Sequence, residues 1–435
     1  PGRKKKAQMV AGGRAPAAAV AGLAAVSLVA GCSTKAQDGT GSNNSSSGGG
    51  GGGVKTDVGV TDKEISLGAL TDQTGTFKVL GTAVTQGNQM WADEVNKSGG
   101  ICGRQIKINV SDTGYSAEKA VTLYNQAKSK DLGFVQLIGS PAMAALKKPL
   151  VTDKIAAVPL SWSSKNLDVP NVLMVGTTYD VEVINGLSYM QSKGKIKPGD
   201  KIGHIYFKTE YGENAVLGSK AYASKHNMTV VEAGISATTT DLTPSVTQLK
   251  GAGVKAIVVT TGPAQLASAL GAARAQGLNV TVYGSGPTYT PQLLETPAAA
   301  LLTSGNFFTS GVSVPFNSAN PKAKEIATAW SAKNAGAVPT YGPQLGYAQA
   351  MVWGAVLKQA CSDGDLTRQG ILNAIRKTTV DTQGLTPNQD FTHPGSPATR
   401  EVFLYTPAKV PGGIAADAQK YVAKEAQEYK APFQK

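Results

Sequence analysis

The sequence predicts an α/β protein of two lobes, each built around an open parallel sheet. Segments with strand character alternate with helical segments from residue 58 onward, and short Gly-rich joints separate them, as in right-handed βαβ units. The alternation ends near residue 160 and starts again at residue 201, so each run is long enough for a core of its own. The 435 residues are 41% hydrophobic and 16% charged, which is typical of a globular chain with one large or two medium domains.

The first run predicts four strands separated by three helices. Apolar residues mark the strands, and a glycine pair, Gly99 and Gly100, closes the first helix. The expected strands span residues 58–70, 105–110, 134–138 and 156–160, and the expected helices span residues 81–97, 116–130 and 141–152.

The second run repeats this order and then adds helices. Its expected strands span residues 201–207, 229–233, 256–261 and 280–283, and its helices span residues 211–226, 242–252 and 264–276. Further helices are expected at residues 321–334, 341–361 and 367–377, then a strand at 400–405 and a charged C-terminal helix rich in Lys, Glu and Gln. Ligands bind outside the carboxyl ends of parallel strands, so two lobes that face each other across those ends predict a cleft.

Residues 1–31 have the pattern of a secretory signal, with basic residues first, an apolar stretch at 15–30, and small residues before Cys32. The sequence Leu28–Cys32 resembles the lipobox of bacterial lipoproteins, in which this cysteine is lipidated. Residues 33–55 are polar and rich in Ser and Gly, so Cys32 and these residues predict a lipidated, flexible linker over 32–55. The resemblance implies a protein that is exported and lipid-anchored to the outer face of the bacterial cytoplasmic membrane.

The net charge bears on the class of binding partner, and the number of cysteines bears on a possible disulfide. The formal net charge is +13, and five basic and no acidic residues precede Cys32, so subtracting these five leaves +8 for the exported chain. The remaining basic residues are scattered, and export argues against a nucleic-acid partner. Lipidation of Cys32 leaves Cys102 and Cys361. These two either form a disulfide, as is common in an oxidising compartment, or remain buried free thiols.

Several motifs in order along residues 58–407 resemble the branched-chain amino acid and amide solute-binding proteins. The resemblance includes a T-G pair near the first strand, a helix ending in D-E-V-N, a G-G-I-C-G turn and an Asp at the end of the next strand. The matching residues are Thr74-Gly75, 87–104, Asp112, Gly139-Ser140, Ser161, Tyr211-Gly212-Glu213, Asp390-Phe391 and Arg400-Glu401-Val402.

This resemblance implies a two-lobed clamshell of the periplasmic-binding-protein type I. The first lobe would comprise residues 56–178 and 312–395, and the second would comprise residues 179–311 and 396–430. The lobes would close on a small organic solute, and the closed monomer would dock on an ABC permease in the membrane. Neither a cofactor nor a metal is implied. Hinge crossings are expected near residues 177–180, 311–315 and 394–398.

The family's ligand contacts lie in loops that follow strands. Family members that bind amino acids place hydroxyl groups in the first of these loops, where this chain keeps only Ser140. Carried over to this sequence, the candidate ligand-binding residues are Ser140, Met143, Trp162, Ser163, Tyr179, Tyr211, Gly262, Gly286 and Tyr289.

One position departs from the family pattern. The family places an acidic residue after the strand that ends here at Tyr283, where it pairs the ammonium group of an amino acid, but this chain has Gly286. A buried ammonium without a partner costs several kcal/mol. We therefore expect a ligand without an α-ammonium, namely a carboxylate, an amide or an aromatic compound. The alternative is a branched-chain amino acid whose ammonium is paired by Asp180 or Glu295.

Two other functions are those of an enzyme and of a sensor. An enzyme is not expected, because the only histidines are His204, His226 and His393, and neither a G-x-S-x-G elbow nor an H-E-x-x-H motif occurs. A sensor that reports its solute to a receptor would have the same sequence pattern. Genes for a permease and an ATPase beside this one would favour import, whereas a kinase or regulator gene would favour sensing.

Overall fold

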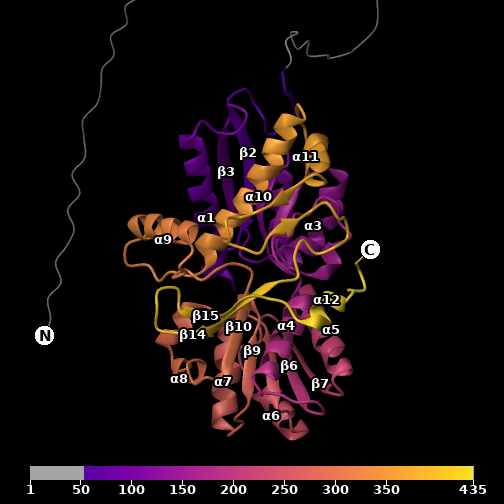
Figure 1. Cartoon of the computed structure of the whole chain (residues 1–435), viewed down its shortest axis with the longest axis vertical. Helices are drawn as coiled ribbons and strands as arrows, with labels where there is room; N and C mark the ends of the chain where they lie inside the picture. Colours follow the sequence, from indigo (N-terminus) through magenta and orange to yellow (C-terminus); the bar gives the residue numbers. More distant parts are fainter. Residues whose placement is uncertain (1–52, 435) are drawn as a thin grey trace, which may run out of the picture. The chain divides into compact units, whose positions relative to one another are not determined.

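A four-stranded and a seven-stranded sheet form the framework of residues 53–434, which are the residues described by the computed structural model (Figure 1). We call each sheet with the helices packed on it a lobe. The first lobe contains the four-stranded sheet, and the second contains the seven-stranded sheet. The predicted α/β fold with two lobes is confirmed. The predicted signal segment, Cys32 and most of the predicted linker lie outside the described residues.

The sheet of the first lobe is entirely parallel, with strand order β3-β2-β4-β5. Its strands are β2 (Glu64–Thr71), β3 (Gln105–Asp112), β4 (Gly133–Ile138) and β5 (Ala157–Leu160). Its helices are α1 (Lys78–Lys97), α2 (Ala117–Ala127), α3 (Ser140–Thr152), α9 (Pro321–Lys333), α10 (Gly342–Ser362) and α11 (Arg368–Ile375). Every residue of β4 is buried, as expected for a central parallel strand covered on both faces.

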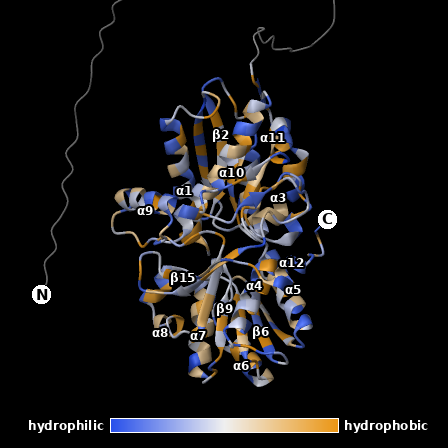
Figure 2. Ribbon diagram, viewed as in Figure 1, coloured by the Kyte–Doolittle hydropathy of each residue, from blue (hydrophilic) through white to orange (hydrophobic). Residues whose placement is uncertain are grey.

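The sheet of the second lobe has the order β15-β14-β10-β9-β8-β6-β7. Its strands are β6 (Lys201–Phe207), β7 (Thr229–Ile235), β8 (Ala256–Thr260), β9 (Thr281–Gly284), β10 (Phe307–Gly311), β14 (Val402–Pro407) and β15 (Ile414–Tyr421). Its helices are α4 (Tyr179–Ser192), α5 (Glu210–Lys225), α6 (Thr243–Ala252), α7 (Pro263–Ala275), α8 (Ala299–Leu302) and α12 (Lys424–Glu428). Strands β14 and β15 are antiparallel, and the others are parallel. Hydrophobic residues occupy much of this sheet and of α7 (Figure 2).

Short elements complete the structure. Two small ladders pair β1 (Lys55–Thr56) with β11 (Asp365–Leu366) and β12 (Thr379–Val380) with β13 (Gln389–Asp390). Three 3₁₀ turns are η1 (Ser164–Asn166), η2 (Gly286–Thr288) and η3 (Pro291–Glu295). Within residues 53–434, no helix combines the length and the apolar character needed to cross a membrane.

The chain passes between the two sheets three times, after β5, after β10 and after β13. The sheet membership of the strands is compatible with lobe boundaries at 56–178 with 312–395 and at 179–311 with 396–430. These boundaries and the hinge positions remain predictions.

The C-terminal prediction was right only in part. The charged helix rich in Lys, Glu and Gln is present as the short α12, but the strand β15, which was not predicted, lies before it. Ile414–Tyr421 pairs with β14, which would otherwise be an open edge of the sheet, and edge pairing overrides the helix propensity of this Ala- and Lys-containing segment. The predicted strand at 58–70 also starts later, at Glu64, because Gly59 and its neighbours form a turn.

Helix α4 was not predicted from the sequence. Eleven of its residues are buried, on every side of the helix. A helix without a polar face lacks the periodic pattern by which an amphipathic helix is recognised. This helix matters for function because it brings Asp180 and Glu182 into the interior.

Cys102 and Cys361 form a disulfide, with Cα atoms 6.2 Å apart and a sequence separation of 259 residues. The bond ties the turn before β3 to the end of α10. Of the two alternatives that the sequence left open, the structure contains the disulfide.

A thiol titration tests this bond. We expect the unfolded, unreduced protein to show no free thiol from these two cysteines, and two after reduction, because a disulfide sulfur does not react with a thiol reagent until it is reduced. Replacement of Cys102 by serine should expose one thiol, at Cys361. Two free thiols in unreduced protein would contradict the pairing.

Candidate functional site

A cavity of about 350 Å³ lies where loops of both lobes meet. The first lobe contributes the turn after β2, the first turn of α1 and the N-terminus of α10. The second contributes the start of α7 and the segment after β9, so the cavity lies at carboxyl ends of strands, as predicted. The lining residues are Gly75–Leu80, Pro263–Gln265, Pro287, Tyr289–Pro291, Thr340 and Tyr341.

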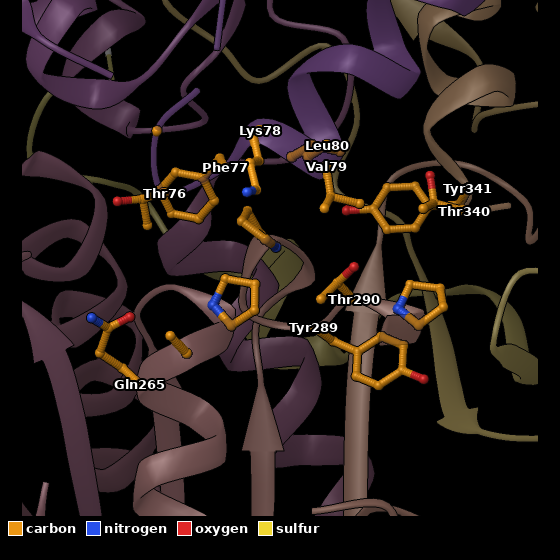
Figure 3. Close-up of a pocket in the computed structure, with 15 residues that line it drawn as sticks. Thr76, Phe77, Lys78, Val79, Leu80, Gln265, Tyr289, Thr290, Thr340 and Tyr341 are labelled. Atoms are coloured by element: carbon orange, nitrogen blue, oxygen red, sulfur yellow. The ribbon is translucent and has the colours of Figure 1, made fainter. Parts of the chain in front are cut away.

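The walls of this cavity are mainly apolar. Figure 3 shows Phe77 and Gln265 toward one side and Tyr289, Thr340 and Tyr341 toward the other. Aliphatic, aromatic and proline side chains make up most of the lining. Such a surface favours a ligand with a large apolar part, which gains free energy when it leaves water.

Lys78 is the only charged residue in this lining, and it is exposed. It begins α1 beside Phe77 and Val79 (Figure 3). Its ammonium group has neither an ion pair nor a side-chain hydrogen bond to any residue of the described chain, 53–434. A cation without a protein partner at the wall of an apolar cavity can receive an anionic group of a ligand.

Two tight contacts fix the cavity walls. A Cβ added to Gly346 would lie 2.0 Å from the carbonyl oxygen of Val84, so α10 packs directly on the backbone of α1, and the first residue of α10, Gly342, lies against Ala83. A Cβ added to Gly262 would lie 2.7 Å from the Thr76 methyl, so the lobes approach closely at that point. Larger side chains at these glycines would push the walls apart.

An aromatic cluster fills the space behind the cavity. Phe77 and Tyr115 have ring centroids 4.8 Å apart, Tyr179 and Tyr211 are 4.6 Å apart, and Trp162 lies 6.0 Å from Tyr179. These rings leave a void of only about 10 Å³. The cluster therefore acts as a floor of the cavity and not as an open pocket.

Four predicted residues, Ser140, Trp162, Tyr179 and Tyr211, surround this small void together. The polar atoms of three of them already have protein partners. The indole nitrogen of Trp162 donates to the Val175 carbonyl oxygen at 2.8 Å, the Ser140 hydroxyl is 2.8 Å from the Ser161 hydroxyl, and the Tyr211 hydroxyl contacts Ser285. A ligand would meet mainly the apolar surfaces of these side chains.

The other predicted residues are more dispersed. Tyr289 lines the main cavity, and its hydroxyl donates to the Gly413 carbonyl oxygen at 2.6 Å. Met143, Ser163, Gly262 and Gly286 line neither the main cavity nor the small void. Ligand contact by the nine residues remains a prediction.

Several residues that line the cavity were not predicted from the sequence. Residues 76–80 follow the carboxyl end of β2, and the strand-end rule that placed the cleft could have identified them. Thr340 and Tyr341 have no such signal, because they precede α10 and reach the cavity only through the packing of α10 on α1.

A buried acid does lie next to Gly286, although the loop after β9 contains none. A carboxylate oxygen of Glu182, from α4, accepts hydrogen bonds from the Gly286 amide at 2.8 Å and the Ser310 hydroxyl at 2.5 Å. Burial raises the pKa of Glu182 to about 7. From the sequence, Asp180 and Glu295 were the acids expected here, and Glu182 was not predicted.

The lobes are joined by a buried polar contact. The Ser164 amide donates to the Asn214 side-chain oxygen at 3.1 Å, and the Ser164 hydroxyl donates to Asp180 at 2.7 Å. Asn214 also donates to Asp180 at 3.1 Å. Asp180 thus has protein donors and does not line either cavity.

A family model described as periplasmic binding protein matches residues 64–409. The chain belongs to the periplasmic binding protein family. This confirms the family predicted from the motifs. The family supplies extracytoplasmic substrate-binding proteins of ABC transporters, and the chain is a protein of this kind.

Several solved structures of proteins from ABC transporters are similar to this chain. A fatty acid ABC transporter substrate-binding protein from Thermomonospora curvata is 38% identical, with a TM-score of 0.84 over 88% of this chain and 98% of that one. A branched-chain amino acid ABC transporter protein from Thermus thermophilus with bound valine is 16% identical, with a TM-score of 0.73 over 85% and 99% of the chains. A leucine-binding protein from Thermotoga maritima is 18% identical, with a TM-score of 0.69 over 81% and 97%. The last two show the fold alone. No curated protein matches the chain.

Proposed function

We propose that this protein binds a monocarboxylic acid with a long apolar tail and delivers it to an ABC permease. The observation that carries the proposal is the apolar cavity with Lys78 as its single charged residue. The 38% identical relative, described as a fatty acid transporter substrate-binding protein, supports the same ligand class.

The ligand carboxylate pairs with the Lys78 ammonium, and the tail lies against Phe77, Leu80 and the proline side chains. Each methylene that leaves water contributes about 0.8 kcal/mol. A charge-assisted hydrogen bond to Lys78 adds about 1.5–3 kcal/mol. The ligand contacts both lobes, so it binds the closed arrangement more tightly than an open one and shifts the population toward closure.

An α-amino acid fits this cavity less well, because its ammonium would need a free acid. The nearby acids are Asp72, Asp180 and Glu182, and all three accept hydrogen bonds from protein donors. Burial also raises the pKa of Glu182 to about 7, so this carboxyl group keeps its proton to a higher pH than an ordinary glutamate does. A protonated carboxyl group does not pair an ammonium.

The sequence supports the cellular setting of this function. Cys32 carries the lipid that anchors the protein to the outer face of the cytoplasmic membrane, and the polar residues 33–52 connect it to the folded part. The solute-loaded monomer reaches its permease in that position. The basis for the anchor is the lipobox-like sequence at Leu28–Cys32.

Thermal unfolding against a ligand panel tests the proposal. We expect dodecanoic acid to raise the midpoint, since a ligand at a hundredfold excess over Kd adds about 2.7 kcal/mol to the free energy of unfolding. Dodecanamide, benzoic acid, leucine and valine should have smaller effects or none. A shift with leucine or valine and none with the acid would contradict the proposed ligand class and restore the amino-acid alternative.

A further inference from the structure

A second cavity, of about 390 Å³, adjoins the first at Pro291, which lines both. It is more open to solvent and is lined by residues of η3, of the segment before α10 and of the turn between β14 and β15. These residues are Pro291, Leu294, Glu295, Val338, Pro339 and Lys409–Gly413.

Two walls of the first cavity continue into the second. Tyr289–Pro291 lines the first cavity, and Pro291 and Leu294 line the second, along the same segment. Thr340 and Tyr341 line the first, and the preceding Pro339 lines the second. A chain that leaves the first cavity on the Tyr341 side in Figure 3 therefore passes between walls of the same two segments.

The third wall, the turn between β14 and β15, is held against the cavity. The Tyr289 hydroxyl donates to the Gly413 carbonyl oxygen at 2.6 Å. Gly413 has φ +69°, and a Cβ there would lie 2.6 Å from the Pro291 Cβ, so only glycine allows this approach. A fixed wall provides a defined surface for a ligand.

Two exposed valines face this space. Val338 and Val410 are 39% and 38% exposed, and both belong to the four large aliphatic side chains most exposed among residues 53–434. Both line the second cavity. The charged residues of its lining, Glu295 and Lys409, are exposed. An apolar chain that covers the valines removes this surface from water, which is favourable.

We propose that the second cavity is a subsite for the distal part of the ligand's apolar tail and that it extends the range of chain lengths the protein binds tightly. This inference rests on the proposed function. With the carboxylate at Lys78, a short acid ends within the first cavity, and a longer acid passes Pro291 and lies against Val338 and Val410.

The test is a series of unbranched saturated acids from hexanoic to octadecanoic, with Kd measured on the full protein and on Val410→Asp. Each added methylene should strengthen binding to the wild type about fourfold as long as it is buried. In Val410→Asp, the affinity should stop rising at the chain length that reaches the charged side chain. The affinity of Val338→Asp should stop rising in the same way. Short acids should bind all three proteins alike.

Val110→Asp is the matched control. Val110 is a similarly exposed valine, at 43%, on the edge strand β3, and it lines neither cavity. Its length series should match the wild type. All these sites are exposed, so unfolding midpoints should change little.

The outcomes separate the two proposals. If no acid of any length binds the wild type, the proposed function fails. If acids bind but wild type and Val410→Asp stop gaining affinity at the same length, the proposed function stands and the subsite is overturned. The subsite is also overturned if Val410→Asp leaves the length series unchanged and instead abolishes self-association or stimulation of the permease ATPase, because the surface then serves as a docking site.

Discussion

Replacement of Lys78 by methionine is expected to weaken the binding of a long-chain acid by about tenfold to a hundredfold. A hydrogen bond to a charged group contributes about 1.5–3 kcal/mol, which corresponds to this range. The loss is large here because Lys78 is the only charged residue that lines the main cavity. Methionine keeps an unbranched apolar side chain, so the wall stays closed while the charge disappears. Titration calorimetry with dodecanoic acid would measure the change.

Two controls separate loss of charge from loss of packing. The methyl ester of the same acid carries no charge, and its affinity should be nearly equal for the wild type and for Lys78→Met. Lys255→Met removes an exposed lysine next to β8 that lines neither cavity, and it should leave acid binding unchanged. An equal loss for acid and ester would show that Lys78 acts through packing and would contradict its role as the carboxylate partner.

Replacement of Glu182 by glutamine is expected to stabilise the protein by about 3 kcal/mol above pH 7 and to have little effect below pH 4. Burial raises the pKa of Glu182 from 4.5 to about 7. Between these values the folded protein keeps a proton that the unfolded chain has lost, so the stability of the wild type falls as the pH rises through this window. The loss is complete above the folded-state pKa and amounts to about 3 kcal/mol. Glutamine carries no charge and retains an oxygen that can accept from Gly286 and Ser310.

Denaturant unfolding of wild type and variant at a series of pH values would measure this difference. His204 makes the free energy of unfolding rise with pH instead. Burial lowers the pKa of His204 to about 3, so the unfolded chain binds more protons than the folded protein up to about pH 6.5. Comparing the two proteins at each pH cancels this contribution. Glu295→Gln, at an exposed site, serves as the control. A difference between wild type and Glu182→Gln that does not change with pH would contradict the assignment.

Much of the secondary structure follows from neighbouring residues. The strands β4, β6 and β8 are short apolar runs between turn residues, and the sequence placed each of them within about two residues of its observed bounds. The same reasoning failed for α4 and β15. In α4 the surroundings bury every side of the helix, and β15 forms because β14 offers an unpaired edge. Both depend on partners that are distant in sequence.

The functional site, too, could be predicted from the sequence only in part. The order of strands and motifs was enough to place a cleft at the strand ends and to predict a ligand without an ammonium group. It did not identify Lys78, since a lysine at a helix start resembles any solvated lysine until the walls around it are known. It also did not predict that Glu182 would reach Gly286 across 104 residues of sequence.

The sequence by itself determined the alternation of strands and helices, the family, and the N-terminal pattern that predicts export. Each of these depends on residues that lie close together in the sequence. Only the tertiary structure decided that a cavity forms beside Lys78, that this lysine has no protein partner among residues 53–434, and that Glu182 is buried against Gly286. Desolvation and hydrogen bonding act over a few ångströms in space. Residues such as Lys78 and Tyr341, or Glu182 and Ser310, acquire their chemistry only when the fold brings them together.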